Sequence, residues 1–199
     1  MAESYLIADI GATNARFKVI NEFEDPRDLA LTTVDYGTSK ELLMMAKAEL
    51  QIRSLSGAML SVAGPVSQDG VSVVLTNSGH LFLAEEMEEA LGCQVWFEND
   101  FVALAHGLDC FIELLQLGGD SKSGAVSAVL GPGSGLGMAT VLREENCRRV
   151  LASEGGHADF APGSHLESEI WSVLAMDSKY VSWESVLSGN GLVRLYQAI

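Results

Sequence analysis

Two glycine-containing turns, each between two strand-like segments, most constrain the fold that this chain can adopt. Residues 4–10 and 15–20 are predicted to be strands on either side of a tight turn at Gly11. Residues 125–130 and 136–142 flank a second turn, GPGSGLG, in the same way. We therefore expect two β-hairpins, each of which opens an α/β unit of the chain.

Strand-like and helix-like segments alternate along the rest of the sequence. Thr38 and Glu41 have the spacing of a capping box ahead of an amphipathic helix. The apolar face of that helix is expected to consist of Leu42, Leu43, Ala46 and Leu50. Further strands are expected at 57–65, 71–77 and 95–97. Further helices are expected at 84–92, 100–117, 166–176 and 191–199. This alternation predicts a mixed α/β fold.

Charge and cysteine content exclude several classes of protein. The chain of 199 residues has 12 Lys and Arg against 27 Asp and Glu, a net charge of −15, and no basic stripe. Nucleic acids and anionic membranes are therefore poor candidate partners. Cys93, Cys110 and Cys147 show no CxxC spacing, so we expect neither a disulfide framework nor a zinc site. With no signal peptide and no apolar run of roughly 18 residues, we expect a cytoplasmic protein.

The first candidate site is the segment DIGATNAR, which begins at Asp9. A strand delivers the Asp9 carboxylate to a tight turn whose successive backbone N–H groups can hold phosphate oxygens. Gly11 allows a phosphate to approach closely, and Thr13 and Asn14 add side-chain donors. Asp9 could orient a hydrated Mg²⁺ that shields the phosphates. The alternative is an ordinary hairpin turn that needs a positive φ at Gly11.

The second candidate site is the glycine-dense turn GPGSGLG, residues 131–137. Gly133 and Gly135 would let the backbone approach a ligand closely, and Ser134 adds a hydroxyl donor. The glycine spacing does not match a dinucleotide-binding fingerprint, and the chain contains no Gly-Lys pair, which a P-loop requires. The turn is therefore a candidate ligand-binding turn that matches neither motif.

Five polar residues are further candidates for ligand binding or catalysis. Asn99 and Asp100 follow a predicted strand, where α/β proteins place ligands, but either could simply cap the next helix. Glu154 and His157 lie in a glycine-rich polar loop that could hold a polyol, although a lone loop histidine is more often structural. Glu184 lies near the start of a helical segment, where a favourable helix-dipole interaction is the alternative explanation.

Taken in order along the chain, five segments resemble the bacterial glucokinase family of the actin, hexokinase and Hsp70 superfamily. The segments are DIGATNAR, the strand-end NDF, GPGSGLG, EGGHADFAP and ESVLSGNGLVRLYQAI. Each motif is weakly specific by itself, but their joint order is highly specific and covers nearly the whole chain. The resemblance implies a ribonuclease H-like, actin-like ATPase fold in two domains, residues 1–108 and 109–199, with the second domain incomplete.

The resemblance also implies an activity and a role for each candidate residue. The family consists of ATP-dependent kinases that phosphorylate glucose on its 6-hydroxyl at the entry to glycolysis and use Mg²⁺. By this similarity Asp100 would accept the proton of the attacking hydroxyl. The sugar would be bound by Asn99, Glu154, His157 and Glu184. The phosphates of ATP would be bound by Asp9, Gly11, Ala12, Thr13 and Asn14 in the first turn and by Gly133, Ser134 and Gly135 in the second.

Three features differ from the usual family pattern. Ala12 stands where members usually have a second glycine, and its methyl group could crowd the β-phosphate. His80 stands where members often have a tryptophan. Members also continue well beyond Ile199, through an adenosine-binding segment, so we expect this chain to be an N-terminal part without measurable turnover by itself.

Two other functions fit the same residues. A non-catalytic sugar-binding or regulatory module could keep the cleft residues without the adenosine half. An interaction domain could instead use the apolar face of the predicted terminal helix. The resemblance leaves a homodimer open. Asp100 and the intact second turn favour the kinase.

Overall fold

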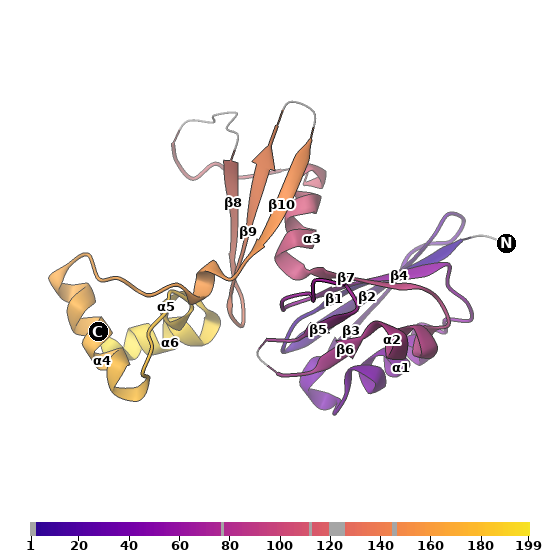
Figure 1. The fold of residues 1–199 in the computed structure, drawn as a ribbon, viewed down its shortest axis with the longest axis horizontal. Coiled ribbons are helices and arrows are strands. Elements are labelled where there is room, and N and C mark those ends of the chain that lie inside the picture. The colour runs from indigo at the N-terminus through magenta and orange to yellow at the C-terminus, as the bar shows by residue number, and fades with distance from the viewer. Residues whose placement is uncertain (1–2, 77, 112, 120–125, 145–146) are drawn as a thin grey trace. The chain divides into compact units, whose positions relative to one another are not determined.

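The computed structural model describes residues 3–76, 78–111, 113–119, 126–144 and 147–199 (Figure 1). The chain divides into two compact units, Met1–Ala103 and Leu104–Ile199. The domain boundary that the sequence suggests near residue 108 is not tested by this division and stays a prediction. Most of the predicted linker GGDSKSG, together with Asn77, lies outside the described residues.

The first unit is built on a five-stranded sheet with the order β3-β2-β1-β4-β7. Its strands are β1 (Ser4–Ile10), β2 (Asn14–Asn21), β3 (Arg27–Thr32), β4 (Gly57–Val62) and β7 (Val95–Asn99). Strands β1, β2 and β3 pair antiparallel, whereas β1, β4 and β7 pair parallel. The predicted first hairpin is therefore confirmed, and β3 is a strand that the sequence pattern did not predict.

Helices α1 (Ser39–Glu49) and α2 (Ala84–Leu91) lie on one face of this sheet (Figure 1). The predicted capping box is present, because the Thr38 hydroxyl accepts a hydrogen bond from Glu41 N–H at 3.1 Å. In return the Glu41 carboxylate accepts from Thr38 N–H at 3.2 Å. Helix α2 ends as predicted at Gly92, whose φ of 78° is the left-handed conformation that glycine adopts readily.

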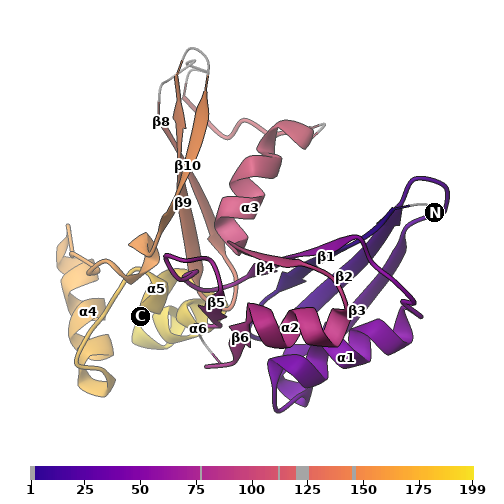
Figure 2. The ribbon, with the colours of Figure 1, turned by 45° about the vertical axis from the view of Figure 1, so that its right-hand side comes forward.

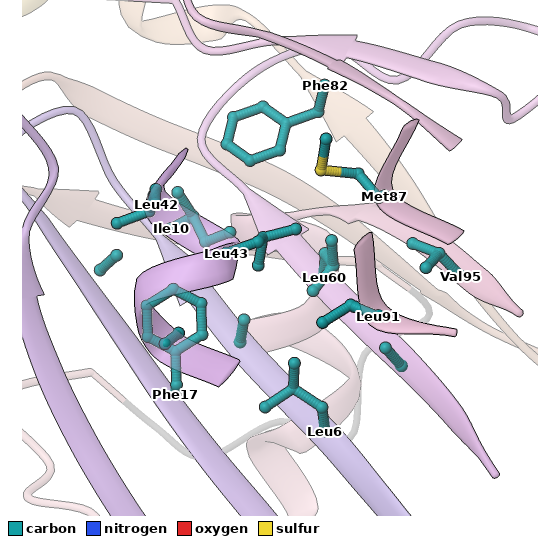
Figure 3. Close-up of a cluster of buried hydrophobic side chains, with 14 of the residues drawn as sticks. Leu6, Ile10, Phe17, Leu42, Leu43, Leu60, Phe82, Met87, Leu91 and Val95 are labelled. Carbon is teal, nitrogen blue, oxygen red and sulfur yellow. The ribbon is translucent and has the colours of Figure 1, made fainter. Parts of the chain in front are cut away.

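The core of the first unit lies between these two helices and the sheet (Figure 3). Alternate residues of β1 and β2 face the helices, so Leu6, Ile10 and Phe17 are buried. Leu42 and Leu43 of α1 pack against them. Burial of side chains of this size contributes about 1.5–3 kcal/mol each, so this packing holds the sheet against the two helices.

Two short strands and a 3₁₀ turn complete the first unit. Strands β5 (Ser72–Val74) and β6 (Leu81–Leu83) pair antiparallel as a separate small sheet. The strand predicted over 71–77 is thus shorter in the structure. The 3₁₀ turn η1 (Thr33–Asp35) follows β3 directly.

The helix that the sequence predicts from residue 100 onward is much shorter in the structure. Helix α3 (Asp100–Gly107) is followed only by the 3₁₀ turn η2 (Leu108–Cys110), so the prediction is wrong beyond that point among the described residues. Leu114, Leu115 and Leu117 are each at least 75% exposed. The segment therefore has no surface to pack against, and a glycine inside a continuing helix would cost roughly 1 kcal/mol.

The second unit is built on a three-stranded antiparallel sheet with the order β10-β9-β8 (Figure 2). Its strands are β8 (Val126–Pro132), β9 (Leu136–Arg143) and β10 (Arg148–Ser153). The predicted second hairpin is confirmed from Val126 onward, whereas β10 was not predicted. After β10 come η3 (Gly155–His157), α4 (His165–Asp177), α5 (Glu184–Leu187) and α6 (Gly189–Ala198). Figure 2 shows α5 and α6 beside the end of the sheet that carries the β8–β9 turn.

Candidate functional site

The parallel strands of the first unit end side by side at one edge of the sheet. Ile10 of β1 is in register with Val62 of β4, and Val62 is in register with Asn99 of β7. The first glycine-containing turn follows Ile10, and Asp100 follows Asn99. The fold therefore brings the first candidate turn and the Asn99–Asp100 pair to the same carboxyl edge, where α/β sheets place ligands.

The backbone of the first turn, Gly11 to Asn14, is fixed by hydrogen bonds on two sides. Gly11 N–H donates to Asn14 O at 2.9 Å and closes the turn. Thr33 N–H donates to Thr13 O at 2.9 Å, and the Thr33 hydroxyl donates to Gly11 O at 2.8 Å. Thr33 is almost completely buried, whereas Ala12 is partly exposed and Thr13 and Asn14 are exposed. Thr33 is a supporting residue that no sequence signal identified.

Gly11 does not have the positive φ that the simple-hairpin interpretation required. The described residues with positive φ are Gln51, Gly70, Gly79, Gly92 and Gly119. The interpretation of the turn as a hairpin that needs a positive φ at Gly11 is therefore wrong. A Cβ atom on Gly11 would lie 3.3 Å from Asn14 O, so the position is restricted by the close approach of the turn's own backbone.

Asp9 lies on the face of the sheet opposite to α1 and α2. Its cross-strand partner is Arg16, whose Nη1 is 3.5 Å from Asp9 Oδ2. Both side chains are more than half exposed, so this ion pair contributes at most about 1 kcal/mol. The pair borders a hollow of about 470 Å³ that is lined by Ile7, Asp9, Arg16, Phe17, Lys18, Asp28, Leu29 and Ala30.

Asn99 caps helix α3, of which Asp100 is the first residue. Asn99 Oδ1 accepts from Phe101 N–H at 3.0 Å and from Val102 N–H at 3.1 Å, while Asn99 Nδ2 donates to Gly64 O at 3.2 Å. Asp100 Oδ1 accepts from Phe101 N–H at 2.9 Å. The capping alternative is therefore confirmed for Asn99 and not for Asp100. The ligand-binding role of either residue stays a prediction.

The second candidate turn is held from outside by helix α6. Within the turn, Gly133 N–H donates to Gly135 O at 2.7 Å, and Gly189 N–H donates to Gly133 O at 2.8 Å. Ser134, at the tip, is exposed. A Cβ atom on Gly133 would meet nothing within 4 Å, and its φ is not positive. Neither packing nor backbone conformation explains this glycine, which agrees with a turn that leaves space for a ligand.

Glu154, His157 and Glu184 come together in the second unit. His157 Nε2 lies 3.9 Å from Glu154 Oε2 and 4.0 Å from Glu184 Oε2. Glu184 is the first residue of α5, as predicted. Its carboxylate also makes a hydrogen bond outside its own helix. Glu184 Oε2 accepts a hydrogen bond from Leu136 N–H at 2.8 Å, at the exit of the second turn. The structure thus joins the predicted polyol loop and the predicted phosphate turn.

Tyr180 is a second supporting residue that the sequence did not reveal. Its hydroxyl donates to the backbone carbonyl of His157 and so holds the polar loop. Partial burial raises the pKa of Tyr180 above its ordinary value, and the Asp159 carboxylate adds to the effect. The hydroxyl therefore keeps its proton, which this hydrogen bond requires, at neutral pH.

Two classes of feature are not found in the part of the chain that the structure describes. No group of three or more His, Cys, Asp or Glu side chains is arranged to hold a metal ion. Within the same residues, no helix is both long and apolar enough to cross a membrane.

Comparisons with known proteins agree with this arrangement. A model of the glucokinase family matches residues 6–199. The glucokinase of Hahella chejuensis is 35% identical over 204 residues, which cover 100% of this chain and 63% of that protein. The crystal structure of a glucokinase from an Antarctic psychrotroph is 30% identical with a TM-score of 0.68, covering 98% of this chain and 64% of the other.

A third comparison supports the fold alone. The crystal structure of a glucokinase from Balamuthia mandrillaris in complex with glucose is 22% identical and has a TM-score of 0.74 over 98% of this chain and 62% of the other. These structures confirm the expected actin-like α/β fold. The chain spans less than two thirds of the length of the relatives that it matches. Because the family model covers almost every residue, the chain belongs to the glucokinase family.

Proposed function

We propose that the protein that carries this chain transfers the γ-phosphoryl group of ATP to the 6-hydroxyl of glucose. One observation carries the proposal: a single hydrogen bond, from Leu136 N–H to Glu184 Oε2, joins the second glycine-rich turn to the cluster of Glu154, His157 and Glu184. A turn suited to phosphate and a carboxylate-rich loop suited to sugar hydroxyls are what this reaction needs side by side. Membership of the glucokinase family supports the same conclusion.

In this proposal Asp100 is the catalytic base. It lies at the carboxyl edge of the first sheet, where β1, β4 and β7 end in register. Its hydrogen bond from Phe101 N–H leaves it able to accept a proton, because an ionised carboxylate has about four acceptor positions. A base that takes the proton from an attacking alcohol contributes roughly 10²–10⁴-fold to the rate.

The remaining candidate residues bind and orient the two substrates. The backbone N–H groups of the two turns would hold phosphate oxygens, and Thr13, Asn14 and Ser134 would add hydroxyl and amide groups. Asn99, Glu154, His157 and Glu184 would bind the sugar hydroxyls. Alignment matters most here, because phosphoryl transfer depends largely on positioning and on neutralising charge.

The exposed carboxylate of Asp9 lies on β1, just before the first turn, and no described group of side chains could hold a metal by itself. This donor set fits a hydrated Mg²⁺ that is held mainly by nucleotide phosphates, which prefers several water ligands and one or two carboxylates. Such an ion would neutralise phosphate charge. Asp9 would orient it through water, and the Arg16 partner of Asp9 would have to yield part of its weak ion pair.

The proposed setting is the cytoplasm. All three cysteines lie in the described part of the chain and none forms a disulfide, which agrees with a reducing compartment. Association into a homodimer stays a prediction that sedimentation velocity would test.

The test of this function is Asp100→Asn in the longest product of the reading frame that carries this chain. The amide still accepts the Phe101 N–H hydrogen bond but cannot take a proton, so kcat should fall by roughly 10²-fold or more. The KM for glucose should stay within about tenfold. The exposed Asp25→Asn, which makes the same change of charge far from the sheet edge, is the control. Near-normal turnover in Asp100→Asn would show that Asp100 is not the catalytic base.

A further inference from the structure

The carboxylate of Glu184 is attached to the exit of the second turn. Glu184 Oε2 accepts from Leu136 N–H at 2.8 Å, although the two residues are 48 positions apart. The Glu184 side chain is only 21% exposed, and Leu136 is the first residue of β9. A hydrogen bond between a partly buried carboxylate and a backbone N–H is among the stronger ones in proteins. Glu184 therefore restrains the point at which the chain leaves the turn.

The segment that follows Glu184 holds the same turn at a second point. Gly189, the first residue of α6, donates its N–H to Gly133 O at 2.8 Å. Helix α5 occupies the residues between Glu184 and Ser188, so the two contacts come from one short, hydrogen-bonded segment. The middle and the exit of the turn are thus fixed by the same neighbour.

The polar loop η3 is pressed against the same strand. A Cβ atom on Gly156 would lie 2.1 Å from Leu136 O, and one on Gly155 would lie 2.6 Å from Met138 Sδ. Gly156 is required because the loop backbone touches the backbone of β9 directly, whereas a side chain at Gly155 would meet the flexible end of Met138. His157, at the end of η3, places Nε2 4.0 Å from the Glu184 oxygen that also binds Leu136 N–H.

From these contacts we infer that Glu184 is a positioning residue for the second phosphate turn as well as a sugar-binding residue, and that it links the two sites. The inference rests on the proposed function. A carboxylate has two oxygens, so a sugar hydroxyl on one of them would hold the other against Leu136 N–H. Sugar binding would then order the turn that receives the nucleotide phosphates. By linkage, an ordered turn would raise the affinity for the sugar by the same factor.

The kinetic test compares three variants in the longest product of the reading frame. Glu184→Ala removes the acceptor and should raise the KM for ATP at least about fivefold, in addition to the KM for glucose. Glu184→Gln keeps an oxygen for Leu136 N–H, so its KM for ATP should stay within about twofold while the KM for glucose rises. Glu154→Ala, which alters the other carboxylate beside His157, should raise only the KM for glucose.

Hydrogen–deuterium exchange followed by mass spectrometry gives a readout that does not depend on turnover. In peptides that cover residues 133–138, exchange should be at least about tenfold faster in Glu184→Ala than in the unsubstituted protein, and unchanged in Glu154→Ala. Glucose should slow exchange there in the unsubstituted protein and in Glu154→Ala at saturation, but not in Glu184→Ala. Peptides from β1 and β2 report whether each variant is folded.

The results of these experiments distinguish a failure of the proposed function from a failure of the positioning role of Glu184. If the unsubstituted protein neither binds nor phosphorylates glucose, the proposed function fails, and the exchange rates still decide whether Glu184 fastens the turn. If glucose is phosphorylated but Glu184→Ala changes only the KM for glucose, with unchanged exchange at 133–138, the positioning role is refuted. If Glu184→Ala does not fold, Glu184→Gln decides, since a rise in its KM for ATP equal to that for glucose contradicts the inferred contact.

Discussion

Replacing Gly156 with alanine should lower the free energy of unfolding of the second unit, and the contacts of Gly156 indicate by roughly how much. The φ of Gly156 is not in the left-handed region, so alanine can adopt its backbone conformation. The added Cβ atom, however, would lie 2.1 Å from Leu136 O, 3.0 Å from Leu136 Cβ and 3.1 Å from Leu136 C. Two of these atoms belong to the backbone of β9, so relief requires a shift of the strand or of η3. Overpacking of this kind costs about 1–3 kcal/mol.

The measurement is thermal unfolding followed by far-ultraviolet circular dichroism. A loss of 1–3 kcal/mol lowers Tm by roughly 4–8 °C per kcal/mol for a unit of this size, so a drop of at least about 4 °C is expected. Gly155→Ala should cost less, because its clash is with the flexible end of Met138. Gly163→Ala is the control, since its Cβ would lie 3.4 Å from a Glu167 carboxylate oxygen, an ordinary contact. An unchanged Tm for Gly156→Ala would refute the claim that η3 is pressed against β9.

Three further outcomes follow from other parts of the chain. Ala12→Gly should lower the KM for ATP and leave the KM for glucose nearly unchanged, because the methyl group lies only in the phosphate turn; an equal or higher KM for ATP would show that alanine is accommodated. Thr38→Ala removes the capping hydrogen bond of α1 and should cost about 1 kcal/mol in urea unfolding, and no shift in midpoint would contradict this. Burial raises the pKa of the Cys93 thiol, so at pH 8 iodoacetamide should label the exposed Cys110 and Cys147 first, as peptide mass spectrometry would show; equal rates would contradict the burial of Cys93.

Much of the fold was predictable where local chemistry and tertiary packing agree. The Thr38–Glu41 pair predicted the start of α1, and Gly92 predicted the end of α2, because capping is decided within a few residues. The helix expected beyond Gly107 failed because periodic leucines alone do not supply a packing surface. Apolar spacing predicts a helix only when another element covers its apolar face.

Three strands were not predicted from the sequence, namely β3, β6 and β10. Of these, β3 and β10 each lie at one edge of a larger sheet. Each is short and begins with two charged residues, and no residue of β3 or β10 is fully buried, so the apolar signal in the sequence is weak. Each is a strand because its neighbour offers hydrogen-bonding partners, which is information that lies elsewhere in the chain.

The candidate site was predictable in its residue types but not in its connections. Asn99 and Glu184 could be singled out as polar residues at element boundaries. Nothing local indicates that Glu184 reaches Leu136 N–H, or that Thr33 holds the first turn from 22 residues away. Contacts of this range depend on the packed sheet.

Charged residues on β3 and β10, each an edge strand of its sheet, affect how the protein behaves at high concentration. An open strand edge presents unpaired N–H and C=O groups that can recruit a strand from another molecule and so start aggregation. Strand β3 begins with Arg27 and Asp28, and β10 begins with Arg148 and Arg149. Bringing such an edge against a second copy would take exposed charged side chains out of water. The exposed Asp28 and Arg149 therefore oppose edge-to-edge assembly, and valine at these two positions should make the edges of β3 and β10 better templates for it.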